Sequence, residues 1–213
     1  MNQNLVWTYE QRSKKVVKAL QKNGFEAVYC ENREAARRNI IDEACHANTI
    51  GFGGSMTVQE LQIESELAEM GKELLQHNRP GLTAEESLAI RHRQLSCDLF
   101  LTSTNAVTMG GQLVNVDGVG NRVGAMTFGP KKVIVAAGRN KIVEDLDAAL
   151  KRIKAIATPA NVRRLNLKLP CGVTGYCSDC NTPDCLCRVT VIMDRKPSLS
   201  DIRVLLINDD LGF

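Results

Sequence analysis

The chain has 213 residues, a hydrophobic fraction of 44%, a charged fraction of 24% and a net charge of +3 at pH 7. This length is enough for one large domain with a substantial core, and the composition is that of a globular protein. The mild charge, the few aromatic residues and the scattered basic pairs argue against a nucleic-acid-binding protein. No apolar run approaches the roughly 20 residues that span a bilayer, and no secretory signal is recognisable, so we expect a cytoplasmic protein without membrane insertion.

The first half of the chain alternates between predicted helices and strands. An amphipathic helix over residues 4–22 is expected to end at Asn23-Gly24. Further helices are predicted over about 34–47 and 57–70 and from Thr83 onward. The predicted strands in this half are FEAVYC, NTIGFGG, KELLQ and CDLFLTS. The alternation predicts an α/β fold with a mostly parallel sheet and helices on both faces.

The pattern changes between residues 105 and 129, where glycines and short apolar alternations predict hairpin strands and turns. KKVIVAAG is then expected to form a central strand. The next segment, NKIVEDLDAALKRIKAIA, has the periodicity of a helix, which Thr158-Pro159 is expected to interrupt. RVTVIM and IRVLLIN are the last predicted strands. We expect a single domain over residues 1–213, with a cysteine-rich loop at 170–188.

The segment TIGFGGSMTVQEL combines a predicted strand, a glycine turn and a helix start. Backbone N–H groups at such a start can hold a phosphate or a carboxylate. The dinucleotide pattern G-x-G-x-x-G fails because Met56 stands where the last glycine is required. On spacing alone, a tight turn capped by Ser55 is the simpler interpretation, and an anion or sugar-phosphate site is the alternative. Its candidate ligand-binding residues are Gly51, Gly53, Gly54, Ser55 and Thr57.

A second candidate binding segment, residues 105–132, is dense in Asn, Asp, Gly and Arg. An arginine can bind a carboxylate or phosphate through two parallel hydrogen bonds, so Arg122 is the expected anion contact. Asp117 is a candidate acid or base. The same residues are good turn formers, so hairpins without a ligand also explain the segment. The candidate residues are Asn105, Gly110, Gly111, Asp117, Asn121 and Arg122.

Five of the eight cysteines lie in LPCGVTGYCSDCNTPDCLCRVTVIM. In a reducing cytoplasm, clustered thiols are more often metal ligands or redox groups than disulfides. Tetrahedral sulfur sites suit both zinc and iron–sulfur clusters. The single Cys177-x-x-Cys180 pair, with lone cysteines on each side, is more typical of cluster ligation than of a zinc ribbon. We therefore favour a [4Fe–4S] cluster, with zinc as the alternative and disulfides or free thiols as the remaining possibilities.

Four stretches carry a resemblance that covers nearly the whole chain: IGFGGSMTVQE, TNAVTMGGQLVNVDGVGNRVGAMTFGPKKVIVAAGRNKIVEDLDAAL, PCGVTGYCSDCNTPDCLC and LLINDDLGF. Together they resemble the LUD (lactate utilisation) domain family. The resemblance implies an α/β fold similar to those of ribose-5-phosphate isomerase, glucosamine-6-phosphate deaminase and CoA transferases. It also implies a place in organic-acid metabolism, because some members belong to operons for lactate oxidation, beside iron–sulfur subunits.

The family pattern places cysteines at four positions of this chain, which the resemblance implies are metal ligands: Cys171, Cys177, Cys180 and Cys187. Cys185 is additional. Before LVNVDG the family usually reads Thr-Glu-Asp-Gly or Thr-Glu-Thr-Gly, whereas this chain reads Thr108-Met109-Gly110-Gly111. Related CoA transferases use a pocket glutamate as nucleophile. Met109 cannot form an acyl anhydride, so ordinary CoA-transferase chemistry lacks its best candidate here.

These observations leave three hypotheses of function. The first is a LUD-like protein of lactate-type organic-acid metabolism that binds an iron–sulfur cluster and transfers electrons with redox partner subunits. The second is an isomerase, lyase or hydrolase that acts on a small anionic or phosphorylated metabolite and holds a structural zinc in the cysteine loop. The third is a non-catalytic ligand-binding or scaffold protein.

Overall fold

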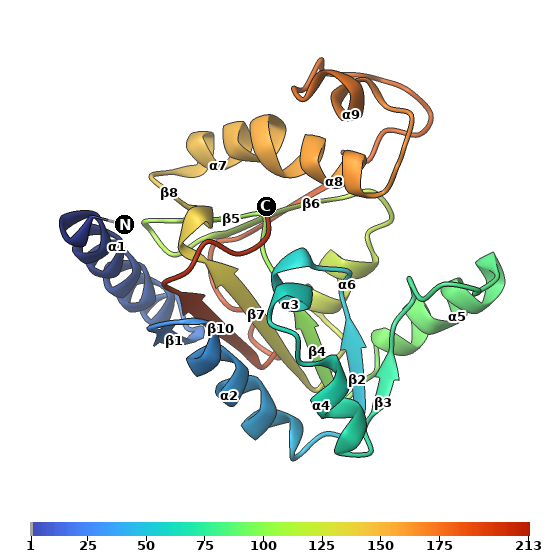
Figure 1. The fold of residues 1–213 in the computed structure, drawn as a ribbon, viewed down its shortest axis with the longest axis horizontal. Helices are drawn as coiled ribbons and strands as arrows, with labels where there is room; N and C mark the ends of the chain where they lie inside the picture. The colour runs from blue at the N-terminus through green and yellow to red at the C-terminus, as the bar shows by residue number, and fades with distance from the viewer. Residues whose placement is uncertain (1) are drawn as a thin grey trace.

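The structure, a computed structural model, describes residues 2–213 and contains two sheets (Figure 1). The larger sheet has six strands, all parallel, in the order β1-β10-β7-β4-β2-β3. Their bounds, in the same order, are Glu26–Cys30, Ile202–Ile207, Lys132–Gly138, Leu99–Thr102, Thr49–Phe52 and Glu73–Leu75. Because the strands are parallel, their carboxyl ends meet at one edge, where open α/β sheets bind ligands.

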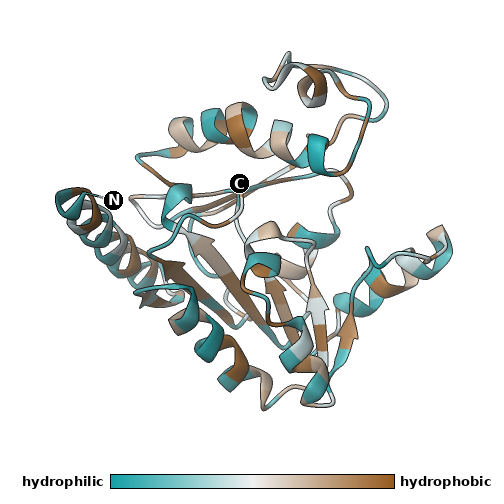
Figure 2. Ribbon diagram, in the orientation of Figure 1, coloured by the Kyte–Doolittle hydropathy of each residue, from teal (hydrophilic) through white to brown (hydrophobic). Residues whose placement is uncertain are grey.

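Helices cover both faces of this sheet, as predicted. Side chains of the central strand β7 alternate, so that Val133 and Val135 lie in one core cluster and Ile134 and Ala136 in the other. The first face is covered by α1 (Gln3–Lys22), α5 (Ala84–Gln94) and α6 (Asn121–Thr127), and the second by α2 (Arg33–Ala44), α3 (Met56–Glu60) and α4 (Glu64–Glu69). The strands between the two layers are mostly apolar (Figure 2), as expected for a doubly covered sheet.

The second sheet is mixed and has the order β8-β5-β6-β9. Its strands are Ile142–Val143, Ala106–Thr108, Leu113–Asp117 and Val189–Met193, in that order. The β5–β6 pair is antiparallel, which confirms the predicted hairpin. Helix α7 (Leu146–Arg152) covers this sheet, because Ala149 packs in one cluster with Ala106 and Val114. Among residues 2–213, no helix combines the length and apolar character needed to cross a bilayer.

Capping side chains confirm two predicted helix starts, but one predicted helix is divided. The Ser55 hydroxyl accepts the Val58 N–H at 3.3 Å, and Thr83 forms a reciprocal capping box with Glu86. The predicted helix over 57–70 is wrong in part. It is two helices, α3 and α4, because Gln62 adopts a left-handed conformation with φ of 53° between them.

The turns predicted after Asp117 are wrong in part, since residues 121–127 form helix α6. Gly120 turns the chain into this helix with φ of 89°. The Asp117 carboxylate then accepts the Val123 N–H at 3.1 Å and satisfies a donor in the first turn. Asp117 therefore closes strand β6 and supports α6 at the same time.

The helix predicted over 140–157 starts later and extends further than expected. Residues 142–143 form strand β8, and α7 begins after its cap Asp145. The prediction that Thr158-Pro159 interrupts the helix is wrong, because a π-helical segment, Ile153–Ala157, leads directly into α8 (Thr158–Arg164). A wider π turn accommodates the proline ring and its missing N–H. The continuous rod carries α8 over the carboxyl edge of the large sheet (Figure 1).

Two glycines with similar backbone angles give a matched test of this packing. Gly111 (φ +80°) lies against α1, where a Cβ would stand 2.7 Å from the Ala19 carbonyl carbon and the Leu20 nitrogen; Gly71 (φ +72°) has no atom within 4 Å of that position. We expect Gly111→Ala to lower the free energy of unfolding by about 2–4 kcal/mol and Gly71→Ala by only about 1 kcal/mol. Urea denaturation measures both, and equal losses would contradict the packing of α1 on the β5–β6 turn.

Candidate functional site

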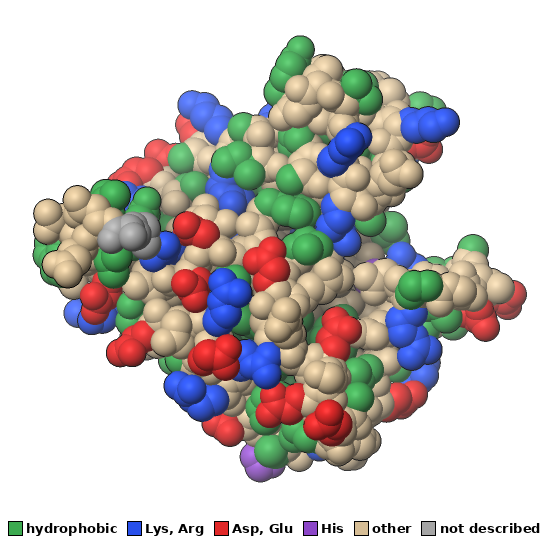
Figure 3. Space-filling model, in the orientation of Figure 1, with side chains coloured by type: hydrophobic (Ala, Val, Ile, Leu, Met, Phe, Trp, Pro, Cys, Tyr) green, Lys and Arg blue, Asp and Glu red, His purple; other side chains and the backbone are tan. Residues whose placement is uncertain are grey.

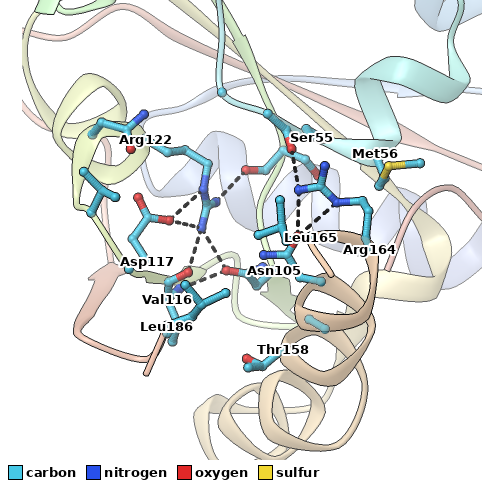
Figure 4. A pocket seen from close by; sticks show the side chains of 18 of the residues that line it. Ser55, Met56, Asn105, Val116, Asp117, Arg122, Thr158, Arg164, Leu165 and Leu186 are labelled. Atoms are coloured by element: carbon cyan, nitrogen blue, oxygen red, sulfur yellow. Dashed lines mark hydrogen bonds and ion pairs between the residues drawn. The ribbon is translucent and has the colours of Figure 1, made fainter. Parts of the chain in front are cut away.

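A cavity of about 300 Å³ opens at the carboxyl edge of the large sheet. It is lined by the segments that follow β2, β3 and β4, by α5 and α6, and by α8, which closes it from the opposite side (Figure 4). On the surface, Figure 3 shows a hollow between the lobe that carries α8 and the arm that carries α5. The cavity therefore occupies the place where this class of sheet binds small ligands.

Lys141 lines this cavity and was missed in the sequence analysis. It lies on a 3-10 turn, Arg139–Lys141, directly after the central strand β7, and is only 3% exposed. Its Nζ donates to the hydroxyls of Thr57 at 2.8 Å and Ser103 at 2.9 Å. Burial lowers the pKa of Lys141 to about 7, and the positive charges of Arg152 and Arg122 act in the same direction. The amine is thus partly neutral at neutral pH.

Arg122, the expected anion contact, has its donors committed to protein acceptors. The acceptors are Asp117 Oδ1 (2.9 Å), the Ser103 carbonyl (3.1 Å), Asn115 Oδ1 (2.6 Å), Asn105 Oδ1 (3.0 Å) and the Val116 carbonyl (3.0 Å). A guanidinium has five N–H groups, so none is left for a ligand. Asp117 also forms an ion pair with Arg122, at 2.6 Å. Arg122 orders the cavity wall, and its charge is neutralised there.

Two other arginines reach the cavity without a carboxylate partner among residues 2–213. Arg164, from α8, donates to Asn161 Oδ1 at 2.7 Å and approaches the Gly54 carbonyl at 3.5 Å. Arg91, from α5, donates to the Ser87 hydroxyl, while its buried Nε has no hydrogen-bond partner. Burial lowers the pKa of both arginines, but a guanidinium stays protonated at neutral pH. Their positive charges are therefore uncompensated.

His77 is half-buried and lines the cavity. Its Nδ1 donates to Gln94 Oε1 at 3.2 Å, because both N–H groups of the Gln94 amide go to the Phe52 and Leu75 carbonyls. Burial, with the positive charges of Arg91 and Arg164, lowers the pKa of His77, so the ring is neutral at pH 7. Asp117 is the only acidic side chain among the lining residues, and Arg122 already pairs with it.

Seven of the eleven predicted ligand-binding residues line the cavity: Gly53, Gly54, Ser55, Asn105, Asp117, Asn121 and Arg122. The other four lie elsewhere. Gly51 packs against the Phe100 ring inside the sheet, and Thr57 is buried behind the cavity, where it accepts from Lys141. Gly110 and Gly111 form the β5–β6 turn, where the Asn23 amide donates to both carbonyls at 2.9 and 3.0 Å. These two glycines hold α1 and do not reach the cavity.

The cysteine-rich loop lines a second cavity, of about 680 Å³. All five of its cysteines line that cavity: Cys171, Cys177, Cys180, Cys185 and Cys187. Cys171 lies in helix α9 (Pro170–Thr174) and is buried, and the Sγ atoms of Cys180 and Cys185 are 3.8 Å apart. All are free thiols. Within residues 2–213, no group of three or more His, Cys, Asp or Glu side chains is arranged to hold a metal ion.

The two cavities share a wall made of Val116, Thr158 and Leu186. Leu186 stands between two of the loop cysteines in sequence, and Cys187 Sγ lies 3.7 Å from the Thr158 hydroxyl. The next residue, Arg188, donates its backbone N–H to the Asp117 carbonyl at 3.0 Å. The cysteine loop is thus part of the structure that encloses the basic cavity.

Comparisons with known proteins agree with this architecture. The LUD domain family model matches residues 13–207, a range that includes every lining residue of both cavities except Phe213. The crystal structure of a DUF162 family protein from Deinococcus radiodurans is similar in fold, with a TM-score of 0.53 over 93% of this chain and 98% of that one. Its sequence is 13% identical. No curated protein matches this chain in sequence.

The lowered pKa of Lys141 makes stability depend on pH. The unfolded chain keeps the lysine proton up to a pKa near 10.5, whereas the folded protein releases it near 7. Between these values the unfolded state binds more protons, so the free energy of unfolding rises with pH. We expect Lys141→Met to reduce this slope between pH 7 and 10, as measured by urea denaturation at several pH values.

Lys131→Met is the matched control. Lys131 is exposed, and its ion pair with Asp98 raises its pKa, so it stays charged in both states over this range. An unchanged slope in Lys141→Met, or an equal change in the control, would contradict a neutral buried amine.

Proposed function

Because the chain belongs to the LUD domain family and has a basic cavity at the carboxyl edge of its sheet, we propose that it binds a small anionic metabolite there. The observation that carries the proposal is a pair of lining arginines without a carboxylate partner among residues 2–213, Arg91 and Arg164. Buried charge is costly unless it is paired. A bound carboxylate or phosphate would supply the missing negative charge.

The cations approach from different elements, which suits a small, compact anion. Arg164 comes from α8, beside Ser55 in Figure 4, and Arg91 comes from α5. Each guanidinium can meet a carboxylate or phosphate through parallel hydrogen bonds. The hydroxyl of Ser55 and the amide of Asn161 add neutral polar groups to the same lining. The volume of about 300 Å³ is at the lower end of ligand pockets, and therefore fits a metabolite of a few carbons.

This chemistry supports an enzyme of organic-acid or phosphorylated-metabolite conversion, of the isomerase, lyase or hydrolase type, ahead of an electron carrier. Organic acids of the lactate type present the carboxylate that the cations require. A partly neutral lysine in the same cavity supplies a group that can exchange a proton near neutral pH. A scaffold protein without ligand would gain nothing from two half-buried, uncompensated arginines beside a buried lysine.

Two adjacent arginines provide the test. Arg164 lines the cavity, while Arg163 is exposed on the same helix and does not. We expect Arg164→Gln to weaken binding of inorganic phosphate or malonate about 10- to 100-fold, as expected for the loss of charge-assisted hydrogen bonds, and Arg163→Gln to leave it unchanged. Isothermal titration calorimetry measures both. Absence of binding by the unmodified protein, or equal effects of the two substitutions, would overturn the proposal.

We further propose that the cysteine loop binds a metal. The donor chemistry fits, since five thiols line one cavity and soft thiolates select zinc or iron–sulfur centres. The geometry fits in part. Two thiolates on one tetrahedral zinc, each at about 2.3 Å, stand roughly 3.8 Å apart, and the sulfurs of Cys180 and Cys185 have this separation. This observation supports the zinc alternative and gives Cys185 a role that the predicted ligand set of Cys171, Cys177, Cys180 and Cys187 did not include.

A [4Fe–4S] cluster remains the competing proposal for the same loop; if bound, it would give the protein a one-electron redox group for partner subunits. A reducing cytoplasm, which we propose as the location, would keep these thiols available. Because fewer than three ligands are in place within the described chain, metal binding is expected to draw the loop together.

Metal analysis after anaerobic reconstitution separates these possibilities. We expect about one zinc per chain, lost in Cys180→Ser and retained in Cys45→Ser, whose exposed thiol at the end of α2 does not line the cavity. Iron with matching sulfide and a visible absorbance band would instead establish the cluster. A protein that takes up neither metal would exclude both.

A further inference from the structure

The hydrogen bonds around Lys141 leave its nitrogen with one unused position. The Thr57 hydroxyl donates to the Leu211 carbonyl at 3.1 Å, and the Ser103 hydroxyl donates to the Thr104 carbonyl at 3.3 Å. Both hydroxyl oxygens are therefore acceptors toward Lys141 Nζ. A neutral amine has two N–H groups and one lone pair. The two N–H groups have partners, and the lone pair is left over on a residue that lines the cavity.

The surroundings favour the neutral form of this amine. Lys141 forms no ion pair within residues 2–213, and the charges of Arg152 and Arg122 oppose its protonation. The negative charge of Glu60 raises the pKa of Lys141, but it is the smallest of these influences. The Glu60 carboxylate accepts the Gly212 N–H at 2.9 Å. An ammonium would need a third acceptor, and within residues 2–213 Nζ forms no third hydrogen bond. An amine acts as a nucleophile in its neutral form, and a lysine that is desolvated beside other cations favours this form.

From this geometry we propose that Lys141 is a catalytic nucleophile that forms an imine with an aldehyde or ketone carbon of the bound anion. The inference rests on the proposed anion site and specifies its ligand class: a small acid that also carries a carbonyl group. Two sources share this chemistry, a 2-oxo acid, whose anionic group is a carboxylate, and an aldehyde or ketone phosphate.

One short loop connects the anion contact to the nucleophile. Arg164 approaches the Gly54 carbonyl, while Lys141 donates to Thr57, three residues further along. An anionic group held by Arg164 therefore lies beside the same short segment, residues 54–57, that the amine contacts. The carbon atoms attached to that group are the part of the ligand that can extend toward Lys141.

The reaction needs no oxidant or reductant. The Nζ lone pair forms a bond to the carbonyl carbon, and the π electron pair moves to the carbonyl oxygen. One nitrogen proton passes to that oxygen. The hydroxyls of Thr57 and Ser103 can relay this proton, because both are within hydrogen-bond distance of Nζ. The second nitrogen proton then leaves with the oxygen as water, and the carbon–nitrogen double bond remains.

Reductive trapping tests the inference on the whole chain. The protein is incubated at pH 7 with sodium cyanoborohydride and either pyruvate or glyceraldehyde 3-phosphate, and the modified residue is located by peptide mass spectrometry. We expect one adduct, on Lys141, with a mass gain equal to the carbonyl compound less one oxygen. Labelling of Lys141 should exceed that of the exposed Lys131 at least about tenfold, because an ordinary lysine is almost fully protonated at this pH. Trapping of pyruvate would identify the ligand class as a 2-oxo acid, and trapping of glyceraldehyde 3-phosphate would identify it as a carbonyl phosphate.

Two variants distinguish catalysis from a structural role. Lys141→Arg keeps a long side chain with N–H donors but cannot form the imine, so the adduct should vanish while the circular dichroism spectrum and phosphate binding persist. Lys131→Arg should leave trapping unchanged. Phosphate or malonate binding that depends on Arg164, without any adduct on Lys141 in either arm, would overturn the imine and leave the anion site intact. Neither binding nor adduct would overturn both.

Discussion

The guanidinium of Arg122 joins the two sheets at the point where the basic cavity opens. It holds Ser103 and Asn105, which follow β4 of the large sheet, and Asn115, Val116 and Asp117 of β6 in the second sheet. Removing it would take one donor from each of five acceptors and the only cation from the Asp117 carboxylate among the described residues, a costly change in a site of low dielectric. The cavity exists because these two strand ends are fixed relative to each other.

Charge neutralisation then separates residues of the same type into different roles. Arg122 has a carboxylate partner and a full set of acceptors, so it is a positioning residue. Among the residues that the structure describes, Arg164 and Arg91 lack a carboxylate partner, and Lys141 has only hydroxyl partners. Positive potential in the cavity therefore comes from side chains on its walls, while the wall's own framework is neutral. Under the proposed function, this division would let the cavity attract an anion without destabilising the fold around it.

The cysteine loop belongs physically to the same site. Leu186 and Thr158 face both cavities, and Arg188 is bonded to the Asp117 backbone. The π turn before α8 brings Thr158, Asn161 and Arg164 to the cavity, although Pro159 made a helix break the natural expectation. The local π-helical irregularity thus brings a distant part of the chain to the basic cavity.

The sequence by itself determined the α/β class, the order of the strands along the chain, the capped helix starts at Ser55 and Thr83, and the crowding of cysteines. These features depend on residues that are close in the sequence, through apolar periodicity, capping side chains and short spacing. They can therefore be recognised from the sequence alone. It did not reveal helix α6, the continuous rod over 146–164, the saturation of Arg122 or the burial of Lys141. Arg91 and Arg164 are 73 positions apart in the sequence. Lys141 has no sequence feature that distinguishes it from a surface lysine, and it shares the cavity with α8 because it follows strand β7. Only the tertiary structure decides such matters, because desolvation and the choice of hydrogen-bond partners depend on which distant segments meet.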